Sequence, residues 1–180
     1  SEQICTSYEM NVELDVTKLR KRCRKKRIHF YPAMMYAIMY EINHHENFRM
    51  AVDEDGKLGV YDVCHPSYTI FHKDDETFSD IWTEWNEDFA VFYKDVCRDM
   101  KQYEDIKGIK AKPDRPDAFT PVSVYRGFLS QLWDMTHRDR GRCIFRSLCL
   151  GVIIKYMTDG CCLSVSWLIM PLRMVIIRLC

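Results

Sequence analysis

The stretch from Ser67 to Tyr103 decides the fold class, because it joins a strand pattern to a long helical pattern. It reads S-Y-T-I-F-H over 67–72 and F-S-D-I-W-T-E-W-N-E-D-F-A-V-F-Y-K-D-V-C-R-D-M-K-Q-Y over 78–103. The first run is rich in β-branched and aromatic residues, which is typical of a strand. In the second, apolar side chains recur every three to four residues, so the spacing predicts a long helix that starts near Ser79.

Two further elements precede this stretch. Residues 11–16, N-V-E-L-D-V, alternate polar and apolar side chains, which is the pattern of a half-buried strand. Pro32 opens a helix, where its missing N–H costs nothing, and His44 and His45 end that helix.

Turn residues mark the connections between elements. Asp55-Gly56 separates the apolar runs 48–52 and 58–63 and is a strong hairpin signal. Residues 106–117 are rich in Gly, Pro, Lys and Asp and are predicted to form an exposed loop, after which 119–123 begins another strand. Hairpin strands together with two substantial helices favour an α/β two-layer sandwich with a mixed, largely antiparallel sheet.

The composition fits one globular domain. The chain has 180 residues, 47% of them apolar, and its 26 basic side chains balance its 26 acidic ones. No net charge therefore draws it to nucleic acid or to a membrane. Nine Cys without a C-x-x-C pair argue against a disulfide scaffold or zinc ribbon and favour a reducing cytoplasm. Because the chain starts at Ser1 without an initiator Met or an apolar signal segment, we expect a shortened N-terminus.

The averages conceal a break near residue 123. Residues 1–123 carry 18 basic and 23 acidic side chains, whereas residues 124–180 carry 8 basic and 3 acidic ones. The last 57 residues contain no Glu, one Lys, seven Arg and five of the nine Cys. The two parts therefore differ in composition as two differently selected sequences would.

A basic run, Lys18–Arg27, carries eight Lys or Arg in ten positions. Such a run can bind a phosphate backbone, or it can be a solvated amphipathic helix. No aromatic side chains interleave with the charges, and the segments that follow are acidic. The solvated helix is therefore favoured, and we expect no nucleic-acid partner.

Histidines and one cysteine are candidates for metal binding or catalysis. The possible ligands are His44, His45, His65, His72 and Cys64. No two of these His lie four residues apart on one helix, so we expect no metal and favour helix-end and surface roles. His72 is either a general base or a hydrogen-bonded structural residue, and the second is favoured because no nucleophile motif accompanies it.

Four separated motifs carry a resemblance to a known family. They are H-F-Y-P-A-M-M-Y (His29–Tyr36), F-R-M-A (Phe48–Ala51), H-P-S-Y-T-I-F-H (His65–His72) and E-T-F-S-D-I-W-T-E (Glu76–Glu84). In this order and spacing the chain resembles the chloramphenicol acetyltransferases from about Asn11 to Ser123. The resemblance implies a coenzyme A-dependent acyltransferase sandwich that assembles as a trimer with active sites between subunits. Acetyl-coenzyme A, as co-substrate, would donate an acetyl group to a hydroxyl of chloramphenicol, which gives antibiotic resistance.

The resemblance also implies roles for five residues. Ser123 corresponds to a Ser that stabilises the tetrahedral oxyanion. Phe78 would line the drug pocket with Cys5 near it, and core packing is the alternative for Phe78. Tyr31 would approach coenzyme A, again with core packing as the alternative, and His29 takes the place of a Lys that faces the coenzyme's phosphate.

Two parts of the family pattern do not occur in this chain. The opening segment of the type W-x-R-x-E-H-F-x-F-Y does not precede Asn11. The motif H-H-A-V-x-D-G, whose His is the family's general base, is also absent, and the only His after Ser123 is His137. From this we expect a chain without a proton acceptor, and therefore without activity.

A shifted reading frame accounts for the second difference. If one base was lost after the Ser123 codon, then Val124–Gln131 is compatible with R-I-P-W-I-S-F-T, which is the family's continuation. The same shift lets 155–166 read Y-D-G-R-[ML]-L-P-V-S-V and 168–178 read [NH]-H-A-V-A-D-G-Y-H-T. The code forces Ala at Met170-Pro171, whereas the His is permitted by the codon of Ile169. We therefore predict the N-terminal part of an acetyltransferase domain over 1–123 and an aberrant tail over 124–180.

This hypothesis predicts that the family's last strands and helix are missing or wrong, with sheet edges exposed. Three other function classes stay open beside the inactive acetyltransferase. One is a non-catalytic remnant that binds coenzyme A or joins an oligomer. Another is a membrane protein anchored by residues 161–180, which is disfavoured because Arg173 and Arg178 lie inside that segment. The last is nucleic-acid binding through Lys18–Arg27.

Overall fold

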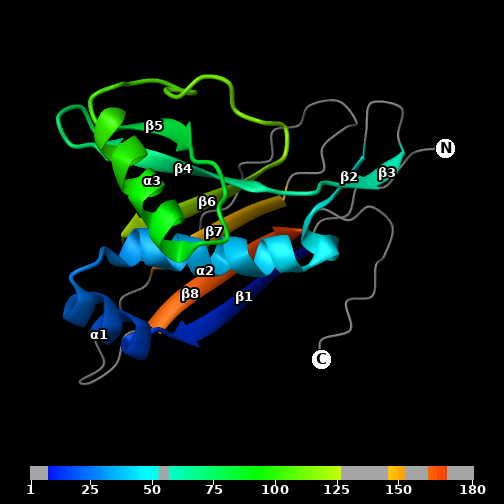
Figure 1. Ribbon diagram of the computed structural model, residues 1–180, viewed down its shortest axis with the longest axis horizontal. Helices are drawn as coiled ribbons and strands as arrows, with labels where there is room; N and C mark the ends of the chain where they lie inside the picture. The colour runs from blue at the N-terminus through cyan, green and yellow to red at the C-terminus, as the bar shows by residue number, and fades with distance from the viewer. Residues whose placement is uncertain (1–7, 53–56, 127–145, 153–161, 170–180) are drawn as a thin grey trace.

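A computed structural model describes residues 8–52, 57–126, 146–152 and 162–169, and the side chains of 15–51 and 57–122 among them. Along the chain, β1 is followed by three helical segments, then by strands β2 to β5, helix α3 and strands β6 to β8 (Figure 1). The helices are α1 (Thr17–Lys26), α2 (Phe30–His44), the short η1 (Glu46–Phe48) and α3 (Phe89–Gln102). The strands are β1 (Tyr8–Asp15), β2 (Met50–Val52), β3 (Leu58–Val60), β4 (His65–His72), β5 (Thr77–Trp82), β6 (Phe119–Arg126), β7 (Arg146–Val152) and β8 (Cys162–Ile169).

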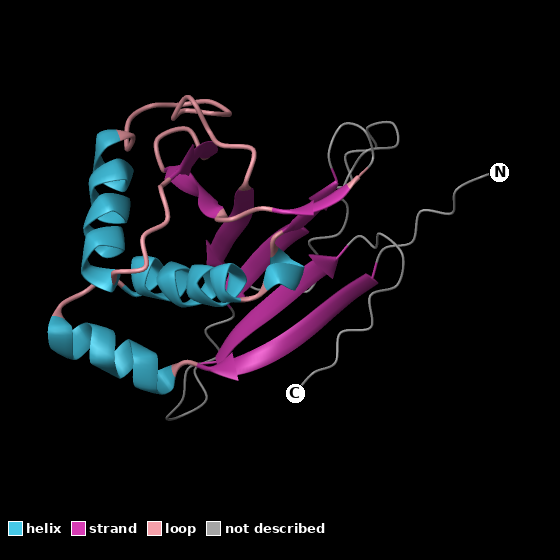
Figure 2. Cartoon of the chain, turned by 45° about the vertical axis from the view of Figure 1, so that its right-hand side comes forward, coloured by secondary structure: helices cyan, strands magenta, loops and turns pink. Residues whose placement is uncertain are grey.

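Six strands form one mixed sheet in the order β1-β8-β7-β6-β4-β5. The contacts β4–β6 and β6–β7 are parallel, and the contacts β1–β8, β7–β8 and β4–β5 are antiparallel. Helices α2 and α3 lie against one face of this sheet (Figure 2). The predicted two-layer α/β sandwich with a mixed, largely antiparallel sheet is therefore confirmed.

The core lies between α2, α3 and the middle of the sheet. Met35 and Met39 from α2, Tyr68 from β4, and Phe92 and Val96 from α3 have no exposed surface. These side chains recur every three to four residues along both helices, which turns one face of each helix toward the sheet. Burial of this apolar area is the main force that fixes the helices over β4 and β6.

The prediction of a helix from Ser79 is wrong. Residues 77–82 form β5 and pair with β4 in the register Ile70↔Ser79 and Tyr68↔Ile81, and α3 begins only at Phe89. Asp88 fixes that start, since its carboxylate accepts the N–H groups of Ala90 and Val91. The β-branched and aromatic residues of β5 gain a full strand ladder, which outweighs an apolar spacing that also suits a helix.

The other predicted elements of the first 123 residues are confirmed with shifted ends. The strand over 11–16 is β1 and the strand from Phe119 is β6. Strands β2 and β3 pair antiparallel, while the Asp55-Gly56 turn predicted between them lies outside the described residues. Helix α2 begins two residues before Pro32 and ends at His44. The basic run Lys18–Arg27 forms α1 and its C-terminal cap.

The sequence predicted that the family's last strands would be missing or wrong, with sheet edges exposed, whereas the described backbone has two strands after β6. Strand β7 pairs with β6, and β8 lies between β7 and β1. Both tail strands contain Val, and β8 also contains Trp and Ile, residue types that are enriched in strands. The tail therefore covers the sheet edges that would otherwise lie open at β6 and β1. Most of residues 161–180, the possible membrane anchor, lies outside the described residues, and no described helix has the length and apolar character needed to cross a bilayer.

Candidate active site

Strand β6 carries the predicted oxyanion residue in the middle of the sheet. It runs parallel to β4 on one side and parallel to β7 on the other, with Ser123 opposite Cys149. Val122, directly before Ser123, is fully buried. The backbone at this position is therefore held on both sides, while the hydroxyl of Ser123 lies outside the described side chains.

Tyr31 ties the start of α2 to β6. Its phenol donates a hydrogen bond to the carbonyl of Val122 over 3.2 Å. Its ring also meets the ring of Tyr68 edge to face, with the centroids 6.2 Å apart. The sequence-predicted residues Tyr31 and Ser123 are thus brought to the same place, because the carbonyl that Tyr31 binds belongs to the residue before Ser123.

A series of buried hydrogen bonds holds the hydroxyl end of Tyr68 in place. The Tyr68 and Thr83 hydroxyls lie 2.7 Å apart, Thr83 donates to Asp99 over 2.8 Å, and Lys112 donates to the same carboxylate oxygen over 2.7 Å. Burial raises the pKa of the Tyr68 phenol, and that phenol stays protonated at neutral pH. These contacts join β4, the segment just after β5, helix α3 and the loop after α3, and so support the Tyr68 ring that meets Tyr31.

His29 lies at the start of α2, where the backbone is still extended. Its N–H donates a hydrogen bond of 2.9 Å to the phenol of Tyr93 on α3. Burial raises the pKa of Tyr93. The side chain of His29 is exposed, so it is free to face a solvent-borne ligand at the end of α2 that also carries Tyr31.

Phe78 lies on β5, the outer strand of the sheet. It stands opposite Phe71 of β4, with the two rings 4.9 Å apart, and both side chains are about half exposed. Phe78 is therefore not core, and its surface is open to an apolar ligand or to another subunit. The structure does not bring it against Tyr31 within one chain, because β4 separates β5 from β6. Cys5 lies outside the described residues.

Sequence analysis did not identify Asp80 of β5 and Arg115 of the loop before β6, which form a polar cluster at the β5 edge of the sheet. Asp80 accepts a hydrogen bond from Ser67 over 2.9 Å and pairs with Arg115, whose guanidinium also lies 3.9 Å from the Phe119 ring centroid. Burial raises the pKa of Asp80, and the bonds from Ser67 and Arg115 partly oppose that shift. A carboxylate inside an apolar strand was the available signal, and the helix expected at 79 concealed it.

The candidate histidines take structural positions. The ring of His72 lies 2.9 Å from the buried Ser79 hydroxyl, as expected for a structural residue. The Nδ1 atom of His65 accepts the N–H of Trp85 over 3.0 Å, and burial lowers the pKa of His65. Among the described residues, no group of three His, Cys, Asp or Glu could hold a metal ion.

Comparison with known proteins shows the family to which the chain belongs. The family model described as chloramphenicol acetyltransferase matches residues 1–137. The chain belongs to the chloramphenicol acetyltransferase family. It is 43% identical over 123 residues to the chloramphenicol acetyltransferase of Vibrio anguillarum, covering 68% of this chain and 55% of that protein. It is 44% identical over 119 residues to that of Clostridium butyricum, covering 66% of this chain and 54% of that protein.

The chain thus spans about half the length of these curated chloramphenicol acetyltransferases. A solved chloramphenicol acetyltransferase structure superposes with a TM-score of 0.73 at 18% identity, over 91% of this chain and 78% of that one. A solved structure described as a probable dihydrolipoamide acetyltransferase from Listeria monocytogenes gives a TM-score of 0.61 at 14% identity, over 92% and 75%. The fold is therefore that of chloramphenicol acetyltransferases and of related acyltransferases.

Proposed function

We propose that this chain derives from a chloramphenicol O-acetyltransferase, which moves an acetyl group from acetyl-coenzyme A to a hydroxyl of chloramphenicol. The observation that carries the proposal is the family match over residues 1–137. The link from Tyr31 to the residue before Ser123 adds local support, because it fixes the strand that bears the oxyanion residue.

Each predicted site residue has a part in this reaction. The Ser123 hydroxyl would donate to the oxyanion that forms when the drug's hydroxyl attacks the thioester carbonyl. Tyr31 and His29, both at the start of α2, would meet coenzyme A, and His29 would face a phosphate. Phe78 would contact the aromatic drug, with Cys5 near it, and its half-exposed ring suits a site between subunits.

The chain as written would lack the general base. Without a neutral imidazole to take the proton, the drug's hydroxyl stays a weak nucleophile and Ser123 has no intermediate to stabilise. We therefore propose an inactive product, with residues 1–123 as the N-terminal part of the acetyltransferase domain and 124–180 as a tail read out of frame. Its ancestor would be a cytoplasmic homotrimer that needs no metal.

Restoring the frame tests both halves of this proposal. One base is inserted after the Ser123 codon in the gene, and acetylation of chloramphenicol is followed by release of the coenzyme A thiol. We expect activity from the restored gene and none from the original, with a three-base insertion at the same point as the control. Activity of the original chain would refute inactivity, and a nucleotide sequence that cannot encode the His motif in any frame would refute the frame shift.

A second candidate is a folded, non-catalytic remnant that binds coenzyme A. It is favoured by the likeness of fold, which extends over 91% of the chain. Coenzyme A at millimolar concentration should then raise the melting temperature, less in Tyr31→Ala than in the control Tyr40→Ala, whose exposed ring stacks on His44. Equal shifts in both variants, or none in the parent chain, would exclude this role.

A further inference from the structure

Helix α1 carries a cationic surface that the proposed acetyl transfer does not use. Seven of its ten residues are Lys or Arg, and Arg27 adds another at the cap. Leu19 and Cys23, four residues apart, turn inward, Leu19 packing against the core and Cys23 buried at 2% exposure. At 100° per residue, the opposite face is then made by Lys18, Lys21, Arg24 and Lys25. We call these four residues the α1 stripe.

The α1 stripe has no ionic partner in the described part of the chain. None of its four side chains forms an ion pair or a side-chain hydrogen bond there, and all four are exposed. The nearest acid is Asp15, whose pKa is lowered mainly by its hydrogen bonds to Thr17, with smaller effects from Lys18 and Lys21. Like charges four residues apart, as in Lys21–Lys25, repel each other. An external anion would relieve this repulsion.

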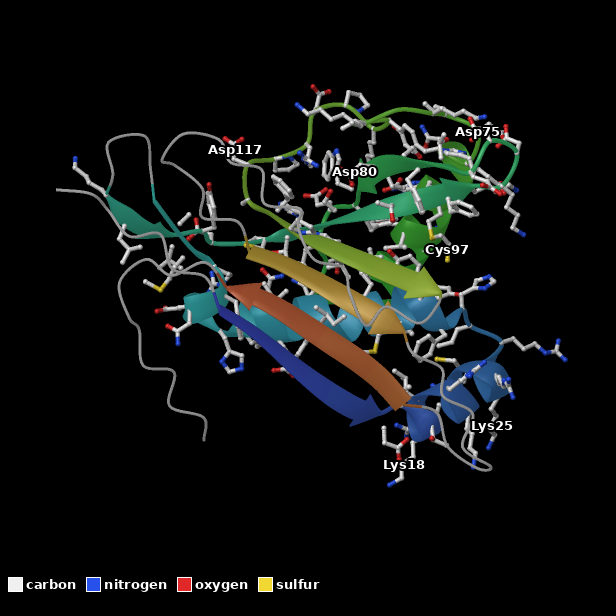
Figure 3. The ribbon with its side chains drawn as sticks, turned by 180° about the vertical axis from the view of Figure 1, so that it is seen from behind. Lys18, Lys25, Asp75, Asp80, Cys97 and Asp117 are labelled. Atoms are coloured by element: carbon white, nitrogen blue, oxygen red, sulfur yellow. The ribbon has the colours of Figure 1, made fainter. Side chains whose placement is uncertain are left out.

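Several acidic side chains lie far from the α1 stripe. Figure 3 shows Lys18 and Lys25 at one end of the molecule, whereas Asp75, Asp80 and Asp117 lie at the other end, over β5 and the loop that leads to β6. Asp74 and Asp75 are already paired with Lys107, and Asp80 with Arg115. These carboxylates are therefore not partners of the α1 stripe, although the net charge of the whole chain is zero.

The residue types of the α1 stripe favour one class of anionic partner over the others. A membrane-surface helix needs exposed apolar side chains to insert, and α1 turns its apolar residues into the protein. A protein interface is enriched in aromatic residues and Met and depleted in Lys, whereas this stripe contains three Lys and no aromatic residue. What fits is a regular array of phosphates without base recognition. Lys18 and Lys25 stand about 10 Å apart along the helix, which spans about three phosphates on one strand of a duplex.

We propose that the α1 stripe binds the sugar–phosphate backbone of duplex nucleic acid without regard to sequence. The sequence favoured a solvated helix and no such partner, because no aromatic side chains interleave with the charges and the segments that follow are acidic. In the described part of the chain, however, no acidic side chain forms an ion pair with the stripe.

The test uses the full chain and a fluorescein-labelled 20-base-pair DNA duplex, with binding followed by anisotropy. Three to four phosphate contacts predict that affinity falls about 40- to 150-fold between 50 and 200 mM salt. The double variant Lys21→Gln/Lys25→Gln should bind at least about 10-fold more weakly at 50 mM salt and show a shallower salt dependence. The charge-matched control is Lys94→Gln/Lys101→Gln, which removes two exposed Lys, seven residues apart, from α3.

The expected result is loss of binding in the α1 variant only, with both variants keeping the parent's circular dichroism spectrum and melting temperature. Equal loss in both variants would mean that net charge alone acts, and would overturn the proposal. Absence of binding at 50 mM salt would overturn it too, as would tighter binding to phosphatidylserine vesicles than to the duplex. None of these results bears on acetyl transfer, which is measured by thiol release.

Discussion

At the scale of single residues, Asp99 is a buried side chain of the described core that has three polar partners. It is 3% exposed and accepts hydrogen bonds from Thr83 and Lys112, and Arg98 lies 3.3 Å away. Lys112 in turn lies over the Trp82 ring, 4.5 Å from its centroid. Removing one partner of such a pair leaves the other charge uncompensated, which costs more than the intact pair contributes.

Asp99→Ala should therefore lower the free energy of unfolding by about 3 kcal/mol, because Lys112 and the Thr83 hydroxyl lose their acceptor. Urea unfolding followed by circular dichroism measures it. Asp95→Ala is the control, since Asp95 pairs with an exposed Arg98 and should cost less than about 1 kcal/mol. Equal losses in the two variants would contradict the role given to these buried hydrogen bonds.

A second residue-scale contact responds to pH. Lys107 pairs with Asp74 and Asp75 and, with Thr77, holds the pKa of Asp75 at about 2, below its ordinary 3.8. A lowered carboxyl pKa stabilises the fold above the unfolded-state value, and this stabilisation is lost as the pH falls from about 4 to about 2. In Lys107→Met the carbon-13 titration of Asp75 should move up toward 3.8. A midpoint unchanged from the parent protein would contradict the pairing.

At the scale of secondary structure, helix ends and strand ladders outweigh apolar spacing. Strand β5 and helix α3 share one continuous three-to-four-residue apolar pattern, yet the chain breaks it between Trp82 and Phe89. Asp88 satisfies the N–H groups of Ala90 and Val91 that would otherwise be unpaired at the helix start. The boundary therefore depends on one capping side chain.

Asp88→Ala should destabilise the protein by about 1 kcal/mol, whereas Asp88→Asn or Asp88→Ser should retain most of the stability. Thermal unfolding monitored by circular dichroism provides the measurement. Glu84→Ala removes an exposed acid just before the cap and serves as the control, with an expected change below about 0.5 kcal/mol. If Asp88→Ala and Glu84→Ala behave alike, the cap does not set the helix start.

At the scale of the whole molecule, the tail strands decide whether the sheet is continuous. Strand β1 reaches the rest of the sheet only through β8 and β7. The register Val12↔Val165 and Leu150↔Val165 makes Val165 the centre of that bridge. Without the two strands, β6 and β1 would each present unpaired backbone groups.

A chain truncated after Arg126 should therefore lose hydrogen-exchange protection in β1 and sediment as aggregates, while the full chain keeps β1 protected. Hydrogen exchange read by mass spectrometry on residues 8–15 is the measurement, with α3 as the internal reference. Protection of β1 that survives truncation would show that β8 is not its partner in solution.

The sequence by itself determined the class of fold and the ancestry. Alternation over 11–16, the Asp55-Gly56 turn and helical spacing after Pro32 are local patterns, and the four quoted motifs lie within the first 123 residues. These features depend on neighbours along the chain, so they can be read without the fold.

Only the tertiary structure decided the boundary between β5 and α3, the strands of the tail and the contacts around Ser123. The link from Tyr31 to Val122 joins residues 91 positions apart, and Thr77–Trp82 became a strand because β4 was available to pair with it. The same holds for the α1 stripe, whose four side chains form no ion pair within the described part of the chain. Contacts between residues distant in sequence decide these features, and no local pattern encodes which distant partners will meet.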